Sequence, residues 1–143
     1  SPAALQGREQ LTTIPSTKIA AAAAYKMAGI TAKDVDFAEV HDCFTVAEVV
    51  DSEDLGFFEK GTGATAARNG DTKLNGSISI NPSGGLKSKG HPIGATGVGQ
   101  VVEAFEQLTG KSGERAVNDA KIGLTQNFGA TGASCAVHIF QSV

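Results

Sequence analysis

The stretch Asn81–Gly99 reads Asn-Pro-Ser-Gly-Gly-Leu-Lys-Ser-Lys-Gly-His-Pro-Ile-Gly-Ala-Thr-Gly-Val-Gly, and the rest of the chain is organised around it. A short strand pattern ends just before it, and an amphipathic helix pattern follows it. Six glycines lie between Gly84 and Gly99, so the backbone must turn sharply there or approach another group closely. His91 lies in the middle, just before the expected helix, whose partial positive charge favours a neutral imidazole. The stretch therefore predicts a loop that presents a candidate catalytic base.

The composition is that of an ordinary globular domain. The 143 residues are enough for one domain with a core, and 41% of them are hydrophobic and 19% charged. A net charge of −3 gives no indication of nucleic-acid binding, and no apolar run is long enough to span a bilayer. No signal-peptide pattern opens the chain, and Cys43 and Cys135 form no Cys-x-x-Cys pair. We expect a reducing, cytoplasmic setting, with neither a nucleic acid nor a membrane as partner.

The order of helix and strand patterns predicts an α/β domain. Ser16 is the expected N-cap of a helix over Thr17–Ala28, which Gly29 ends. The other expected elements are strands over Val35–Val40, Ser77–Ile80, Lys121–Gln126 and Ala133–Phe140, and helices over Thr45–Leu55, Ala64–Arg68 and Ala95–Leu108. The last two strands, joined by a tight turn at 129–132, are expected to pair antiparallel. Together these elements predict a mixed β-sheet with helices on its faces.

Two of the expected helices carry polar faces. In Ala95–Leu108 the valines and Phe105 lie on one side, while Glu103 and Gln107 are expected to be more exposed. In Thr45–Leu55 the acidic face is expected to be solvated; its residues are Glu48, Asp51, Glu53 and Asp54.

Two motifs carry a resemblance to a known family. The run Gly90–Gly97, Gly-His-Pro-Ile-Gly-Ala-Thr-Gly, resembles the catalytic-histidine loop of the thiolases, and Asn81–Gly85 resembles the lead-in to that loop. The run His41–Phe44, His-Asp-Cys-Phe, resembles the motif of the thiolase branch that includes archaeal and sterol-carrier-protein-type enzymes. The resemblance extends from about Pro2 to the last residue. It implies that residues 1–143 are the C-terminal half of a thiolase fold, in which two similar halves stack helix against helix. We expect the first strand of this half, and the N-terminal half with the nucleophile, to be absent from this chain, as in a fragment or a split protein.

The resemblance also implies roles for individual residues. His91 would be the base that activates the nucleophilic cysteine and would help to bind the thioester oxygen. His41 would complete that oxyanion hole. Gly129 would contribute to a second one, with Asn127 as a further candidate donor there. Gly90 belongs to the glycine loop that would let the thioester come close. Commoner thiolases carry an acid/base cysteine where this chain has Asn127. In the branch with the His-Asp-Cys-Phe motif, the resemblance places the acid/base thiol on the cysteine of that motif, which here is Cys43.

Each of these roles has a purely structural alternative. His91 would then be a hydrogen-bonded structural histidine, and Cys43 a small buried apolar residue. Neighbouring histidines that lower the pKa of the Cys43 thiol would favour the acid/base role. Asp42 is expected to be structural, as part of a turn or as a helix cap.

The function implied by the resemblance is acyl transfer between coenzyme A thioesters, as condensation or thiolysis, of the acetyl-CoA acetyltransferase type. The acyl-CoA is then the substrate, and neither a metal nor a further cofactor is implied. We expect the isolated chain to be inactive without its N-terminal half, and a homo-oligomer is possible. The alternatives are a thiolase-like subunit that cleaves aldol adducts as a lyase, and a non-catalytic fragment or partner subunit.

Overall fold

A mixed four-stranded sheet in the order β2-β1-β3-β4 forms the middle layer of the protein. The computed structural model describes residues 7–129 and 131–142. The strands are β1 (Phe37–Glu39), β2 (Ser79–Ile80), β3 (Ile122–Gly129) and β4 (Ser134–Gln141). β1 pairs parallel with both β2 and β3, whereas β3 pairs antiparallel with β4. The predicted mixed sheet and the predicted antiparallel pair are therefore confirmed.

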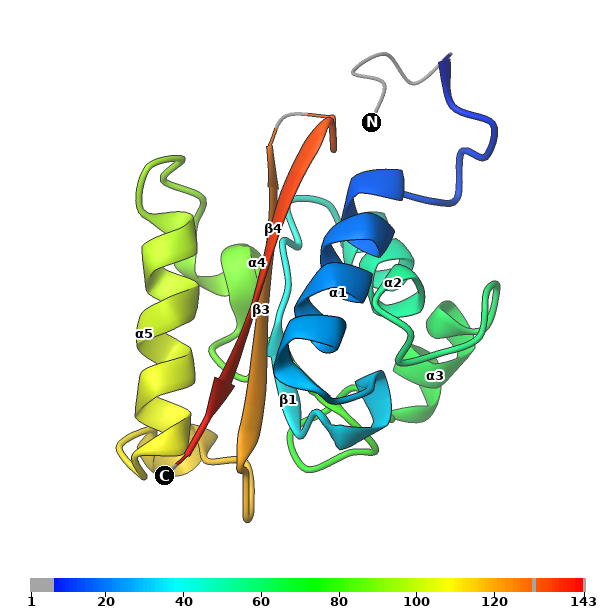
Figure 1. Ribbon diagram of the computed structural model, residues 1–143. Coiled ribbons are helices and arrows are strands. Elements are labelled where there is room, and N and C mark those ends of the chain that lie inside the picture. Colours follow the sequence, from blue (N-terminus) through cyan, green and yellow to red (C-terminus); the bar gives the residue numbers. More distant parts are fainter. Residues whose placement is uncertain (1–6, 130, 143) are drawn as a thin grey trace.

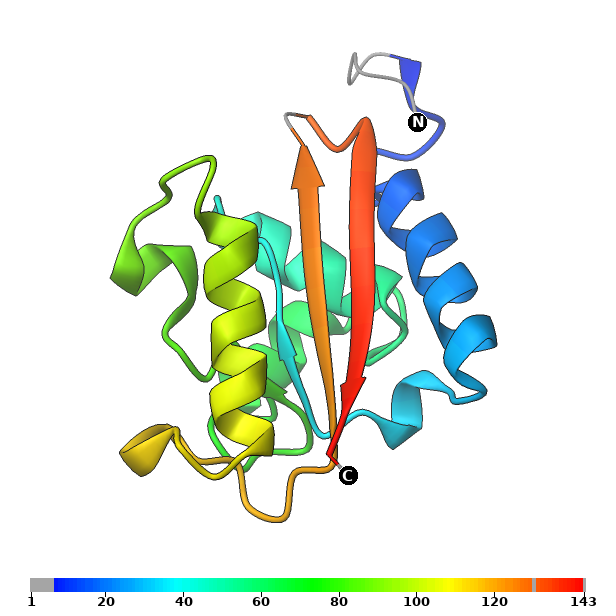
Figure 2. The ribbon, with the colours of Figure 1, turned by 60° about the vertical axis from the view of Figure 1, so that its left-hand side comes forward.

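Helices cover both faces of this sheet (Figure 1). On one face lie α1 (Pro15–Ala28), α2 (Thr45–Asp54) and α3 (Gly63–Asn69), and on the other α4 (Gly85–Lys89) and α5 (Thr96–Leu108). Figure 2 shows α5 and α1 on either side of the long β3–β4 pair. Two short 3₁₀ turns, Ala32–Asp34 and Gly113–Arg115, complete the structure. No helix in the described ranges is both long and apolar enough to cross a membrane.

The main core lies between the sheet and the α1–α2 layer. Its buried side chains come from both layers and from the segments between them; they are Ala21, Val35, Ala38, Val40, Leu55, Ile78, Ile80 and Leu124. On β1, Phe37 is fully buried, and a Cβ at Gly123 on the neighbouring strand would overlap its ring. Because only a glycine leaves room for that ring, the pairing of β1 with β3 depends on this position.

Helix α1 begins two residues earlier than predicted. Pro15 is its first residue and Ile14 occupies the N-cap position without a side-chain cap, so the prediction of Ser16 as N-cap is wrong. Proline suits the first helical position because it has no N–H to leave unpaired. The Ser16 hydroxyl instead donates to the backbone oxygen of Gly132 at 2.7 Å and ties α1 to the β3–β4 turn. Gly29 ends the helix with φ of 70°, as predicted.

Helix α5 reverses the expected relation between polarity and burial. Val98 is 65% exposed and Phe105 is 56% exposed, whereas Glu103 is only 5% exposed. The buried polar side chains are held by specific partners: Gln100 Nε2 donates to two backbone oxygens of the sheet, and Glu103 pairs with Arg115 at 3.1 Å. The prediction that the polar side of this helix is the more exposed one is therefore wrong. The apolar stripe of α5 has no cover within the described chain.

The acidic face of α2 is also buried rather than solvated. Asp51 and Asp54 are both buried. Asp54 accepts from the Ile14 N–H at 2.6 Å and from Lys60 Nζ at 2.8 Å, and Glu48 accepts from Asn81 Nδ2 at 3.0 Å. These carboxylates hold the start of α1 and the loop after β2, so the expectation of a solvated face is wrong.

Candidate functional site

The candidate site lies where the three parallel strands end. His41 follows β1, Asn81 follows β2, and Asn127 lies near the C-terminal end of β3. Carboxyl ends of parallel strands meet at one edge of a sheet, and ligands of open α/β sheets bind there. Asn81 strengthens this edge, since its Oδ1 accepts from the Val40 N–H at 2.8 Å and its own N–H donates to Ala38 O at 2.7 Å.

The two predicted catalytic histidines lie together. The ring centroids of His41 and His91 are 4.8 Å apart, and the rings meet edge to face at 85°. His41 is 5% exposed and also packs against the Phe128 ring, with a centroid distance of 4.5 Å. His91 comes from the glycine-rich loop and is exposed on its other side. Residues far apart in the chain thus form one imidazole pair.

Burial keeps the His41 ring neutral. Burial lowers the pKa of His41 below its ordinary value, and the positive charge that His91 can carry lowers it further. A hydrogen bond with the Asn127 side chain and the charge of Asp42 oppose this shift without reversing it. A neutral imidazole has one N–H donor, and within the described chain the buried Nδ1 has no hydrogen-bond partner. The ring therefore retains hydrogen-bonding capacity that none of the described residues uses.

Thr96 orients His91. Its hydroxyl lies 2.7 Å from His91 Nδ1 and donates to the backbone oxygen of Pro92 at 3.2 Å. Because a hydroxyl has one proton to donate, Thr96 accepts from an Nδ1–H when it donates to Pro92. That tautomer leaves Nε2 of His91 without a proton, which is the form a general base requires.

Cys43 lines an apolar groove of about 300 Å³. The groove also includes Ile14, Phe44, Val50 and Phe128. Burial raises the pKa of the Cys43 thiol, and the charges of Asp51 and Asp42 act in the same direction. The expectation that neighbouring histidines would lower this pKa is wrong. At neutral pH the group is a thiol, which suits a proton donor better than a nucleophile.

Asn127, Gly129 and Gly90 complete the set of predicted site residues. β3 continues beyond the predicted Gln126, so Asn127 lies within the strand and Gly129 is its last residue. Both line a second groove, of about 660 Å³, which Phe128 shares with the Cys43 groove. Gly90 is the C-cap of α4 with φ of 83°, directly before His91. The imidazole pair, the thiol and the end of β3 are thus arranged around Phe128.

Gln126 and Asp51 are part of this region and were not predicted. Gln126 Oε1 accepts from the backbone N–H of His41 at 2.9 Å, and its Nε2 donates to Asp51 Oδ1 at 2.9 Å. Both side chains are fully buried. The signal for Gln126 is an uncharged polar residue within a strand pattern, while nothing in the sequence distinguishes Asp51 from the other acidic residues of α2. Among the described residues, no group of three or more His, Cys, Asp or Glu side chains is placed to hold a metal ion.

Comparison with known proteins identifies the family. The family model described as thiolase C-terminal domain-like matches residues 2–142. The chain belongs to this family. It is 51% identical over 137 residues to an acetyl-CoA acetyltransferase of Methanothermobacter thermautotrophicus, covering 96% of this chain and 36% of that protein. It is 47% identical over 117 residues to human sterol carrier protein 2, covering 82% of this chain and 21% of that protein.

The family's fold is confirmed by a solved structure. The chain superimposes on the Ltp2-ChsH2(DUF35) aldolase with a TM-score of 0.82 at 22% identity, covering 95% of this chain and 34% of that one. The chain spans about a third of the length of the acetyl-CoA acetyltransferase it matches. It therefore corresponds to one part of a larger family architecture.

Proposed function

We propose that this chain is the C-terminal catalytic half of a thiolase that transfers acyl groups between coenzyme A thioesters. The observation that carries the proposal is the contact between His41 and His91, whose ring centroids lie 4.8 Å apart. Acyl transfer through a thioester needs a base for a thiol and a donor for an oxyanion, and the two imidazoles supply one of each. The match to acetyl-CoA acetyltransferases supports the substrate class.

In the thiolytic direction the reaction begins at His91. His91 takes the proton from a cysteine of the N-terminal half, and the thiolate attacks the 3-keto carbon of the acyl-CoA. The carbon–carbon bond breaks, and the enolate that leaves takes the proton of the Cys43 thiol to become acyl-CoA. Coenzyme A then gives its thiol proton to the Cys43 thiolate and attacks the acyl-cysteine. The released cysteine thiolate recovers its proton from His91.

His41 and the end of β3 would stabilise the oxyanions. His41 is neutral and buried, so it donates a hydrogen bond without bringing a net charge that the site must solvate. The raised pKa of Cys43 keeps its proton available for the enolate. The backbone around Gly129, next to the groove, would serve the second oxyanion. Coenzyme A thioester is the substrate here, and the cytoplasmic setting stays a prediction.

The exposed stripe of α5 is the surface that we assign to the N-terminal half. Val98, Val101, Val102 and Phe105 are all more than a third exposed on one side of this helix, and Ile93 extends the apolar surface toward His91. A helix that exposes its apolar side to solvent is typical of a surface on which another protein surface packs. Because the stripe continues to the catalytic loop, packing there would bring a nucleophile close to His91.

The test combines this chain with a thiolase N-terminal half and measures thiolysis of acetoacetyl-CoA. We expect the pair to be active and each half alone to remain at background. His91→Ala should remove activity, and His41→Ala and Cys43→Ala should lower it strongly. Lys121→Ala is the control, because this exposed side chain lies just before the start of β3, at the opposite end of the strand from Asn127, and it should leave the rate unchanged.

Activity of this chain alone, or full activity of the His91→Ala pair, would contradict the proposal. A pair that binds but cleaves only aldol adducts would instead favour the lyase function.

A further inference from the structure

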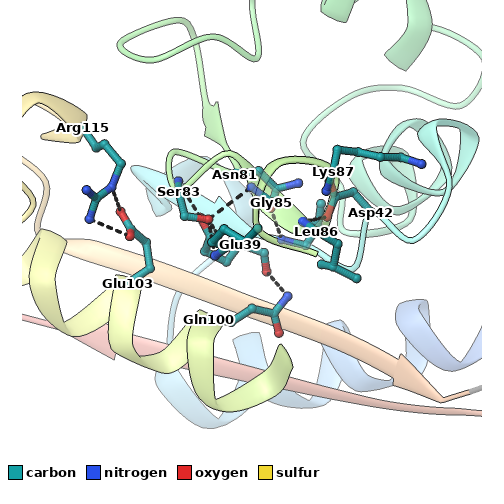
Figure 3. Close-up of polar contacts among 12 residues, drawn as sticks. Glu39, Asp42, Asn81, Ser83, Gly85, Leu86, Lys87, Gln100, Glu103 and Arg115 are labelled. Carbon is teal, nitrogen blue, oxygen red and sulfur yellow. Dashed lines mark hydrogen bonds and ion pairs between the residues drawn. The ribbon is translucent and has the colours of Figure 1, made fainter. Parts of the chain in front are cut away.

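Two buried carboxylates at the end of β1 hold the loop that leads to His91 (Figure 3). Glu39 is 1% exposed and Asp42 is 2% exposed, and both accept hydrogen bonds from the segment 81–89. We call these two residues the carboxylate clamp. Buried carboxylates are unfavourable unless hydrogen-bonded, so two of them facing one loop indicate that its position is strongly constrained.

Asp42 caps helix α4 from a distant part of the chain. Its Oδ1 accepts from the Leu86 N–H at 2.8 Å, and its Oδ2 accepts from the Lys87 N–H at 3.3 Å. The cap confirms the expectation that Asp42 is structural. A Cβ at Gly85 would overlap the Asp42 carboxylate, and Gly85 also has φ of +62°. This position in the loop must therefore be glycine for the carboxylate to reach α4.

Glu39 holds both ends of the same segment. Its Oε1 accepts from the Ser83 N–H at 3.0 Å, and its Oε2 accepts from the Ser83 hydroxyl at 2.7 Å and pairs with Lys89 Nζ at 3.5 Å. Ser83 lies before α4, and Lys89 is the last residue of that helix. The backbone oxygen of Glu39 also accepts from Gln100 Nε2 on α5 at 3.3 Å. The clamp thus connects β1 to the segments on both sides of His91.

The carboxylate clamp connects the segments that carry the two imidazoles. Asp42 is adjacent to His41 in the chain, and the helix that it caps ends at Gly90, directly before His91. We propose that Asp42, supported by Glu39, is a positioning residue that sets the separation of the His41 and His91 rings. The role goes beyond capping, because a cap alone would stabilise α4 without affecting the geometry of the pair. The proposal rests on the proposed function only in taking these two rings as the reacting pair.

Four variants of the full chain separate this role from general stability. Asp42→Ala removes both acceptors, whereas Asp42→Asn loses the same charge but keeps an oxygen that can accept from the Leu86 N–H. Ser83→Ala removes a hydroxyl that Glu39 binds, at a half-buried position where the substitution is mild. Glu103→Gln is the control, since Glu103 is also a buried carboxylate but accepts from Gln107 and Arg115 rather than from the backbone of segment 81–89.

The measurement is NMR of uniformly ¹³C,¹⁵N-labelled protein. The chain has three histidines, and His138 serves as an internal reference. The wild type, Asp42→Asn and Glu103→Gln should give a nuclear Overhauser effect between the His41 and His91 rings. Asp42→Ala should lose it, and its Leu86 and Lys87 amides should exchange about tenfold or more faster, as expected for a lost hydrogen bond to a charged group. Ser83→Ala should weaken the same effect.

The proposal is overturned if the ring–ring effect keeps its wild-type intensity in both Asp42→Ala and Ser83→Ala, or if Glu103→Gln loses it equally. Should Asp42→Ala fail to fold, Ser83→Ala decides the question alone. In the assembled two-half enzyme, Asp42→Ala should lower kcat more than tenfold and Asp42→Asn should restore most of the loss. If no version has thiolase activity, the proposed function fails while the NMR result still decides the positioning role.

Discussion

Asp51 should make the stability of the protein fall as pH rises. Its carboxylate is fully buried, and its Oδ2 has no hydrogen-bond partner within the described chain. Burial raises the pKa of Asp51 from 3.8 to about 8, against hydrogen bonding from Thr17, which lowers it. Between these two pH values the folded state keeps a proton that the unfolded state has lost. The stability that protonated Asp51 provides is therefore complete below about pH 4 and is lost as pH rises toward 8.

The magnitude follows from the size of the shift. Each pKa unit corresponds to about 1.36 kcal/mol, so titration of Asp51 lowers the free energy of unfolding by up to roughly 4 kcal/mol between pH 4 and pH 7. Asp51→Asn keeps an oxygen that can accept from Thr17 Oγ1 and Gln126 Nε2, and it does not titrate. We expect the variant to match the wild type near pH 4 and to exceed it by about 2–4 kcal/mol at pH 7.

Urea unfolding of both proteins at pH 4.5, 6, 7 and 8, followed by circular dichroism, measures this difference. Glu59→Gln removes one carboxylate from an exposed position and controls for the change in net charge. A difference between Asp51→Asn and wild type that stays constant across this pH range would refute the reasoning, as would an equal gain in Glu59→Gln.

Three further changes test other parts of the structure. Gly123→Ala should lower the free energy of unfolding by about 2–3 kcal/mol, because its Cβ overlaps the buried Phe37 ring, and urea unfolding measures the loss. Thr96→Val should lower it by about 1 kcal/mol and raise the fraction of His91 protonated on Nε2, visible in ¹⁵N chemical shifts; an unchanged tautomer would contradict the role of Thr96. Phe105→Glu should change stability by less than about 0.5 kcal/mol but weaken binding of the N-terminal half at least tenfold in calorimetry. Unchanged binding would exclude the α5 stripe as that interface.

Local patterns predicted the elements, because their signals lie within a few residues. Gly29 ends α1 as expected, and the β3–β4 pair forms where the alternating patterns indicated it. Helix α4 was missed because Gly84 is its N-cap and Gly85 its first residue, and because the carboxylate that accepts from its first turn is Asp42, more than forty residues earlier in the chain. Such a helix depends on a long-range contact that no local pattern reports.

Burial was harder to predict than secondary structure. The periodicity of α5 correctly separated an apolar from a polar side, but Glu103 lies on the buried one because Arg115 and Gln107 satisfy its charge and its oxygens. Periodicity reports that two sides differ and not which of them faces this sheet. The buried polar groups around the site, such as Gln126, form by contacts between distant segments, and only the structure assembles them.

The motif residues of the site were found because two short motifs carried a family resemblance, not because their spacing required them to meet. The contact of His41 with His91 depends on how β1 and the glycine loop are placed in three dimensions. Their roles in the reaction stay predictions that the assembled enzyme will test.

Phe128 is a wall shared by the two grooves at the end of β3, one lined by Cys43 and the other by Asn127 and Gly129. Its ring also rests on the buried imidazole of His41. Replacing this aromatic side chain with a smaller one would connect the two grooves and remove the ring against which His41 packs. A substitution at this position would therefore change both the separation of the two grooves and the packing of the His41 ring.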